Sequence, residues 1–238
     1  MLPADLRQAE DQALAALCSA LDANTAGRWT VELRFEGLRL LPLALRLAAS
    51  LQAEGRPLQM LCPDAGATAL ARRDHPELAP LIASLGEHRR RQEAEGATGD
   101  SLAEGVLPLL LVVGPDPSDY GLVETVCSAH RGAVVLLNPS LEDAAVGIGS
   151  VARARRKGFL AQWQAAYALV PLANGALRQA HPGPWELYRL DPDGFRLAAE
   201  FAQKPSQEER AEALTGEAPG GLRQQLEGLG ELIDNLQR

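Results

Sequence analysis

Apolar and polar residues follow two different spacings along the first 140 residues of the chain. Segments with apolar residues every three or four positions predict helices, whereas short alternating or wholly apolar runs predict strands. We expect helices over residues 3–21 and 38–53, and from Asp119 to about Ala129. A further helix is expected to start within residues 67–73. We expect strands over residues 29–35, 58–62, 106–113 and 133–137. The chain therefore repeats the order strand, turn, helix.

The run Val106–Val113 is the most hydrophobic in the sequence and does not alternate. A strand of this kind is typical of a parallel sheet that is covered on both faces. Parallel strands joined by helices require right-handed crossovers, which place helices on the faces of an open sheet. The sequence thus predicts an α/β fold, namely a three-layer, Rossmann-like domain with a mainly parallel sheet.

The C-terminal third follows a different pattern. Residues 185–190 and 195–201 flank Asp193-Gly194, a dipeptide that favours a hairpin turn. We expect an antiparallel hairpin at the edge of the sheet. Residues 162–173 fit both a helix and an extended segment, and the polar stretch 87–105 is interpreted as a helix end followed by a surface loop.

Two units are predicted, an α/β domain over residues 1–205 and a C-terminal helical extension over 206–238. The Gly- and Pro-containing stretch 215–221 would form a linker between them. Beyond it, apolar residues at a four-three-four-three spacing define one stripe on a helix: Leu222, Leu226, Leu229, Ile233 and Leu236. A single helix of this length is marginal in water, so the stripe is expected to dock on its own domain or on a partner.

Composition excludes several classes of function. A net charge of -8 and only 4% aromatic residues do not suit nucleic-acid binding, which needs a basic surface and stacking platforms. The sequence has no run of about 18 uncharged apolar residues and no secretory signal near Met1–Glu10, so we expect neither a membrane span nor export. Three widely spaced cysteines indicate buried thiols in a reducing compartment, a cytoplasm or a plastid stroma.

Polar residues follow several predicted strands. Asp64, Asp116, Asp119 and Asn138 come after three of them, and Tyr120 follows Asp119 at the start of a predicted helix. Ligands of open parallel sheets bind beyond the carboxyl ends of the strands, so we expect these five residues to form part of a binding site. The sequence has neither a G-x-G-x-x-G nor a P-loop motif, which counts against the two common nucleotide sites.

A glycine pair and a basic cluster follow within residues 147–157. Gly147, Gly149, Arg153 and Arg156 could cradle an anion such as a phosphate, a carboxylate, a lipid headgroup or an acidic loop of a partner. Two alternatives stay open: a solvated helix face, or arginines that pair with Asp64 or Asp116 of the same domain. We expect no metal site and no cofactor, because the four histidines lack ligand spacing, and we assign no catalytic residue.

The order of short motifs along the chain resembles the DUF1995 family of cyanobacterial and chloroplast proteins, from about Pro3 to Pro205. The matching segments are 63–67, 69–73, 119–120, 137–139, 141–143, 147–149, Arg153, Arg156, 159–160, 167–169, 171–172 and 182–187. The resemblance brings no established reaction. Because the family includes the chloroplast low photosystem II accumulation factor, it implies a cytoplasmic or peripheral thylakoid protein of a cyanobacterial type, concerned with photosystem biogenesis.

The sequence therefore favours a non-catalytic accessory or assembly factor that acts through protein–protein contacts. The alternative is an enzyme or sensor that binds a phosphorylated small molecule or nucleotide at the strand ends. A third expectation is peripheral membrane contact through the basic cluster, which local charge allows in spite of the acidic net charge.

Overall fold

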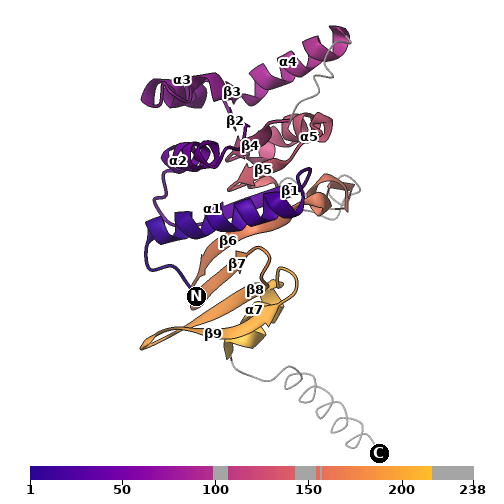
Figure 1. Cartoon of the computed structure of the whole chain (residues 1–238). Helices are drawn as coiled ribbons and strands as arrows, with labels where there is room; N and C mark the ends of the chain where they lie inside the picture. The colour runs from indigo at the N-terminus through magenta and orange to yellow at the C-terminus, as the bar shows by residue number, and fades with distance from the viewer. Residues whose placement is uncertain (99–106, 143–153, 156, 216–238) are drawn as a thin grey trace, which may run out of the picture.

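One mixed sheet runs through the molecule (Figure 1). The structure is a computed structural model that describes residues 1–98, 107–142, 154–155 and 157–215. Within these residues the strand order is β3-β2-β4-β5-β1-β6-β7-β8-β9. The strands are β1 (Arg28–Leu33), β2 (Leu58–Cys62), β3 (Ile82–Ser84), β4 (Leu109–Val113), β5 (Val134–Leu137), β6 (Gln164–Leu172), β7 (Gly175–Ala180), β8 (Trp185–Asp191) and β9 (Gly194–Phe201). Pairing is parallel from β3 to β6 and antiparallel from β6 to β9.

Helices cover both faces of the parallel half. The α-helices are α1 (Leu6–Ala23), α2 (Leu40–Ala53), α3 (Ala65–Asp74), α4 (Leu85–Thr98), α5 (Tyr120–Ala129) and α7 (Gln207–Thr215), and short 3₁₀ turns occur at η1 (Ala79–Leu81), η2 (Pro117–Asp119) and η4 (Phe159–Gln162). The buried residues of α1, α2 and α3 belong to one apolar cluster, and those of α4 and α5 to a second cluster across the sheet.

Strand β4 shows why the sheet needs both layers. Leu109, Leu111 and Val113 pack into the cluster under α1 and α2, whereas Leu110 and Val112 pack into the cluster under α5. Every residue of β4 is buried. A strand with no polar face is stable only where both faces are removed from water, so the prediction is confirmed for residues 109–113. Leu107, which is 49% exposed, and Pro108 precede the strand, and residue 106 lies outside the described residues.

The predicted fold class is confirmed as well: a mainly parallel sheet, flanking helices and an antiparallel hairpin at the C-terminal edge. The hairpin β8–β9 is part of a larger antiparallel region that starts at β6. Strand β7 and the three-residue β3 were not predicted. The ambiguous segment 162–173 is mostly extended, since all but its ends lie in β6.

The prediction of a helix end and loop over 87–105 was wrong for its first part, because α4 extends to Thr98. Its start is fixed by a capping box in which the Glu87 backbone donates to Ser84 Oγ and the Ser84 backbone donates to Glu87 Oε2, both at 3.1 Å. An Arg89–Glu93 pair on the next turn supports the helix. Helix caps and such pairs compensate for the small apolar content of this segment.

Helix α7 covers part of the antiparallel region, where Ala213 and Leu214 pack on the cluster formed by Ala168, Leu177, Trp185 and Leu187. The division at residue 205 stays a prediction. The leucine-striped segment 222–238 lies outside the described residues. No helix in the described part of the chain is long and apolar enough to cross a membrane.

Candidate functional site

The carboxylate of Asp64 is used by the fold. Asp64 follows β2 and is the N-cap of α3, where its Oδ1 accepts a hydrogen bond from the Ala67 backbone at 2.7 Å. Its backbone carbonyl accepts from Thr68 Oγ1 at 2.7 Å. An N-cap satisfies backbone donors that the first helical turn leaves without partners. The geometry therefore gives Asp64 a structural role.

Asp116 and Asp119 form a comparable motif after β4. Asp116 Oδ1 accepts from the backbone and hydroxyl of Ser118 at 2.7 and 2.6 Å, and the Asp116 backbone donates to Asp119 Oδ2 at 3.3 Å. The Ser118 hydrogen bonds lower the pKa of Asp116. Burial, together with the negative charges of Asp116 and Asp64, raises the pKa of Asp119. Carboxylates from two neighbouring strand ends thus lie within electrostatic reach of one another.

These acids lie at the topological switch point of the sheet. The chain leaves β2 towards β3 through α3 on one face, and leaves β4 towards β5 through α5 on the other face. A crevice between two such strand ends is the usual ligand position in open α/β sheets. In the described residues, however, the carboxylates of Asp64 and Asp116 beside this crevice already cap the turns that contain them.

Tyr120 and Asn138 also have internal partners. The Tyr120 ring is buried beneath the Arg155 guanidinium, 4.4 Å from the ring centroid, and meets the edge of Phe159. The side-chain amide of Asn138 donates to the Leu33 carbonyl and accepts from the Leu33 N–H. Gly147, Gly149, Arg153 and Arg156 lie outside the described residues, so their expected meeting with the strand ends stays a prediction.

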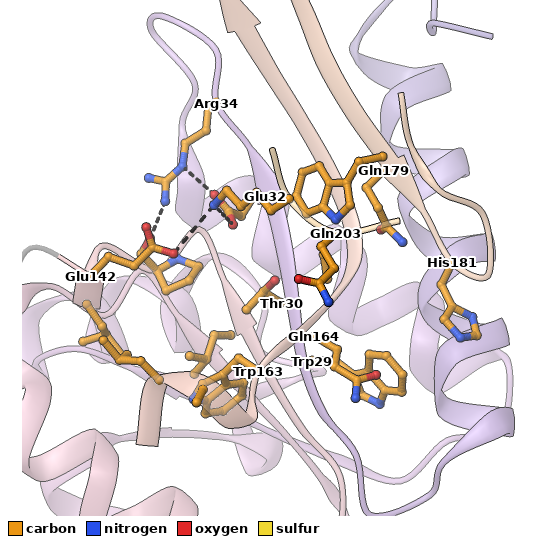
Figure 2. Close-up of a pocket in the computed structure, with 18 of the residues that line it drawn as sticks. Trp29, Thr30, Glu32, Arg34, Glu142, Trp163, Gln164, Gln179, His181 and Gln203 are labelled. Atoms are coloured by element: carbon orange, nitrogen blue, oxygen red, sulfur yellow. Dashed lines mark hydrogen bonds and ion pairs between the residues drawn. The ribbon is translucent and has the colours of Figure 1, made fainter. Parts of the chain in front are cut away.

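A groove of about 810 Å³ lies elsewhere, along the side of β1 that carries Thr30, Glu32 and Arg34 (Figure 2). It runs over β1, between η4 and the loop after β5 on one side and the segment after β9 on the other. Side chains from distant parts of the sequence line it: Trp29, Thr30, Glu32, Arg34, Leu136, Pro139, Ser140, Leu141, Glu142, Leu160, Ala161, Trp163, Gln164, Ala165, Gln179, His181, Trp185, Ala202, Gln203 and Lys204.

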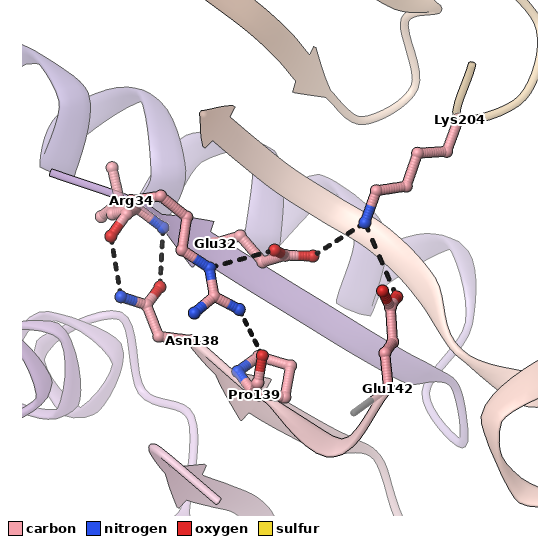
Figure 3. Close-up of polar contacts among 7 residues, drawn as sticks. Glu32, Arg34, Asn138, Pro139, Glu142 and Lys204 are labelled. Atoms are coloured by element: carbon pink, nitrogen blue, oxygen red, sulfur yellow. Dashed lines mark hydrogen bonds and ion pairs between the residues drawn. The ribbon is translucent and has the colours of Figure 1, made fainter. Parts of the chain in front are cut away.

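One end of the groove holds a charge network (Figure 3). Glu32, whose side chain is 12% exposed, accepts from Arg34 Nε at 3.3 Å and pairs with Lys204 Nζ at 3.7 Å. Lys204 Nζ also lies 3.6 Å from Glu142 Oε1, and Arg34 donates to the Pro139 carbonyl. Each cation of the groove therefore faces a carboxylate or a carbonyl of the same chain.

Aromatic rings form much of the remaining lining. Trp29, Trp163 and Trp185 are the three tryptophans of the sequence, and all of them line this groove. Trp29 meets the ring of His181 at 5.3 Å, and Trp163 meets Phe159 at the same centroid distance. Lys204 Nζ lies 5.8 Å from the Trp185 ring centroid. In a chain with only 4% aromatic residues, all three tryptophans are among the lining residues, and clefts lined by aromatic side chains and a few polar groups are the usual form of a binding site.

Three polar atoms of the lining residues are buried and have no partner among the described residues. Gln179 is 7% exposed; its amide nitrogen donates to the Gly183 carbonyl at 3.3 Å, but its Oε1 accepts nothing. The indole nitrogens of Trp163 and Trp29 also lack an acceptor, and that of Trp29 lies against Gly27. Buried polar atoms are nearly always paired, so a donor and an acceptor left open beside one cavity point to a ligand or ordered water there.

Burial makes two of the cysteines and one histidine unreactive at neutral pH. Burial raises the pKa of Cys62 to about 11 and that of Cys127 to about 12, so both thiols are protonated at neutral pH. Burial lowers the pKa of His130 to about 4, and its imidazole is therefore neutral. The described residues contain no cluster of three or more His, Cys, Asp or Glu side chains able to hold a metal ion.

Sequence reasoning missed the groove, although β1 carried a signal. Thr30, Glu32 and Arg34 alternate with buried Trp29, Val31 and Leu33. A central strand of a parallel sheet that keeps polar residues on one face indicates that no helix covers that face. The predicted site was placed instead at the carboxyl ends of the strands, where open parallel sheets usually bind ligands.

A family model matches most of the chain. The family model described as "Domain of unknown function (DUF1995)" matches residues 3–212. No curated protein matches the chain. The matched segment contains the whole described sheet and every residue of the groove. Since the match covers most of the sequence, the chain belongs to the DUF1995 family.

Proposed function

We propose that the protein is a non-catalytic accessory or assembly factor that acts through protein–protein contacts. The observation that supports this is that the polar side chains at the strand ends, where α/β enzymes place their reacting groups, have structural partners. Asp64 and Asp116 are used there as caps, and the Asn138 amide is used in strand pairing. What remains open is a groove whose lining suits binding.

The process we propose is photosystem biogenesis in a cyanobacterial-type cell, with the protein in the cytoplasm or at the periphery of the thylakoid membrane. This rests on family membership together with the resemblance to the chloroplast low photosystem II accumulation factor. The basic cluster at Arg153 and Arg156 would supply contact with an acidic partner or with anionic headgroups.

Co-purification from native extracts tests the proposal. Tagged full-length protein is compared with three changes: charge reversal of Arg153 and Arg156, deletion of 222–238, and Trp163→Ala in the groove. At least one change should reduce recovery of photosystem subunits at least severalfold. If the set of bound proteins is the same for all four proteins, the interaction function is wrong.

The second candidate, a sensor or enzyme for a phosphorylated small molecule at the strand ends, receives less support. Asp64 and Asp116 lie near enough to Asp119 for their negative charges to add to burial in raising its pKa, and carboxylates gathered in this way disfavour a phosphate. A thermal-shift screen with nucleotides and sugar phosphates separates the candidates. A ligand at 100 times its Kd would stabilise the fold by about 2.7 kcal/mol, and a flat screen would leave the binding-protein proposal in place.

A further inference from the structure

We propose that the groove over β1 binds an extended, uncharged segment of a partner protein that contains proline. The inference rests on the proposed function, because it names the class of partner surface that the accessory factor would hold. It is carried by the shape of the groove, by the pairing of its charges and by its unpartnered polar groups.

The groove follows a strand. Along β1 it is lined from Trp29 to Arg34, a distance of about 17 Å at the usual rise of about 3.3 Å per residue. A polyproline-type peptide, with a rise of about 3.1 Å per residue, would cover this distance with about six residues. A compact ligand would fill only part of such a site, so the length favours a chain.

The charges of the groove exclude a strongly charged occupant. Glu32 and Glu142 balance Arg34 and Lys204, and Lys204 lies between the two carboxylates. A phosphate or an acidic peptide would have to displace Glu32 from its cations, leaving a carboxylate that is 12% exposed without a partner. Burial of an unpaired charge is costly. A neutral segment leaves the network intact.

The tryptophans and glutamines match the chemistry of such a segment. Proline rings pack on indole faces and edges, and a proline-containing chain is already extended before it binds. Its backbone carbonyls are free to accept from the Trp163 indole nitrogen, and a neighbouring peptide N–H can donate to Gln179 Oε1. Both groups lack a partner among the described residues. Trp185, which is 8% exposed, forms a rigid wall beside them, whereas the Trp29 ring belongs to the apolar cluster under α1.

A random twelve-residue peptide library, panned on the full-length protein, tests the proposal without a known ligand. Enriched peptides should share prolines and carry a net charge near zero. Because every tryptophan lines the groove, their binding should also change the intrinsic fluorescence of the protein, which gives a Kd directly.

Two variants locate the site. Trp163→Ala should weaken binding at least tenfold. Gln203→Arg adds a cation to an exposed position of the lining and should weaken it severalfold without affecting folding. Gln52→Arg is the matched control, since Gln52 is an exposed glutamine on α2, across the sheet. It should bind like the parent.

The absence of enriched peptides, enrichment of charged ones, or equal binding by Gln203→Arg and Gln52→Arg would overturn the inference. If planar aromatic compounds change the fluorescence while no peptide does, the groove is a small-molecule site and the inference is again wrong. The proposed function is judged separately: it stands if co-purification depends on Arg153, Arg156 or residues 222–238 while groove variants have no effect.

Discussion

The side chain of Asn138 pairs with the backbone of Leu33 as a residue of a neighbouring strand would. Its Nδ2 donates to the Leu33 carbonyl at 2.7 Å, and its Oδ1 accepts from the Leu33 N–H at 2.7 Å. Asn138 follows β5 and adopts a left-handed backbone, with φ of 48°. This amide therefore continues the β5–β1 ladder beyond the last residue of β5, beside the Pro139 carbonyl that accepts from Arg34 (Figure 3).

Replacing Asn138 by alanine should lower the free energy of unfolding by about 2–3 kcal/mol, because two hydrogen bonds are lost and both Leu33 groups lose their partners. Alanine in a left-handed conformation adds about 1 kcal/mol. Urea unfolding of Asn138→Ala and Asn138→Gly separates the two contributions. Both variants lose the two hydrogen bonds, but only Asn138→Ala also has the cost of the left-handed backbone. Equal stability of the parent and Asn138→Ala would show that the amide pairing contributes nothing.

Gly27 should not tolerate a side chain. A Cβ at this position would lie 2.2 Å from Trp29 Nε1, so Gly27→Ala must displace a ring that lines the groove. Overpacking of this kind costs about 1–3 kcal/mol, and the tryptophan emission should shift. At Gly121 of α5 nothing lies within 4 Å of the added methyl, so Gly121→Ala is the control and should stabilise by about 0.5–1 kcal/mol. Comparable losses in both variants would contradict the packing of Trp29 on Gly27.

His130 should make stability depend on pH. Burial lowers its pKa from about 6.5 to about 4 in the folded protein, so between these values the unfolded chain binds a proton that the folded chain does not. The His130 contribution is complete above pH 6.5 and is lost as the pH falls towards 4. In His130→Gln, the decrease in unfolding free energy from pH 7 to pH 5 should be smaller than in the parent.

His75, a partly exposed histidine whose Nδ1 lies 2.9 Å from Glu77 Oε1, provides the control for that measurement. His75→Gln should keep most of the decrease between pH 7 and pH 5. An unchanged pH dependence in His130→Gln would mean that the imidazole is accessible to protons in the folded state.

The cysteines should differ in reactivity. Burial raises the pKa of Cys62 to about 11 and that of Cys127 to about 12, whereas Cys18 is partly accessible. With a thiol reagent at pH 7.5, native protein should label at Cys18 first, and the other two only at the rate of unfolding. Peptide mapping identifies the modified residue. Rapid labelling of native Cys127 would contradict its burial and its raised pKa.

Much of the sheet could be predicted from the sequence, because the burial of apolar runs and the geometry of tight turns depend on neighbouring residues. The mostly apolar strand Leu58–Cys62 and the run that ends at Val113 need burial on both faces wherever they lie, and helices on the two sides of the sheet supply it. The turn at Asp193-Gly194 also depends on neighbouring residues only, and β8 and β9 meet there. Strand β3 is too short to show a period, and the polar helix α4 is specified by Ser84 and Glu87 rather than by an apolar face.

The sequence alone determined that a layered, mainly parallel sheet would form, since apolar runs with helical segments between them have few other ways to leave water. Tertiary structure decided where a binding surface remains. Thr30, Glu32 and Arg34 face a groove because β1 pairs with β5 and β6, a strand order set by contacts between residues more than a hundred positions apart. The same distant contacts gather Trp29, Trp163 and Trp185, while Asp64 and Asp116 are used by the turns that contain them.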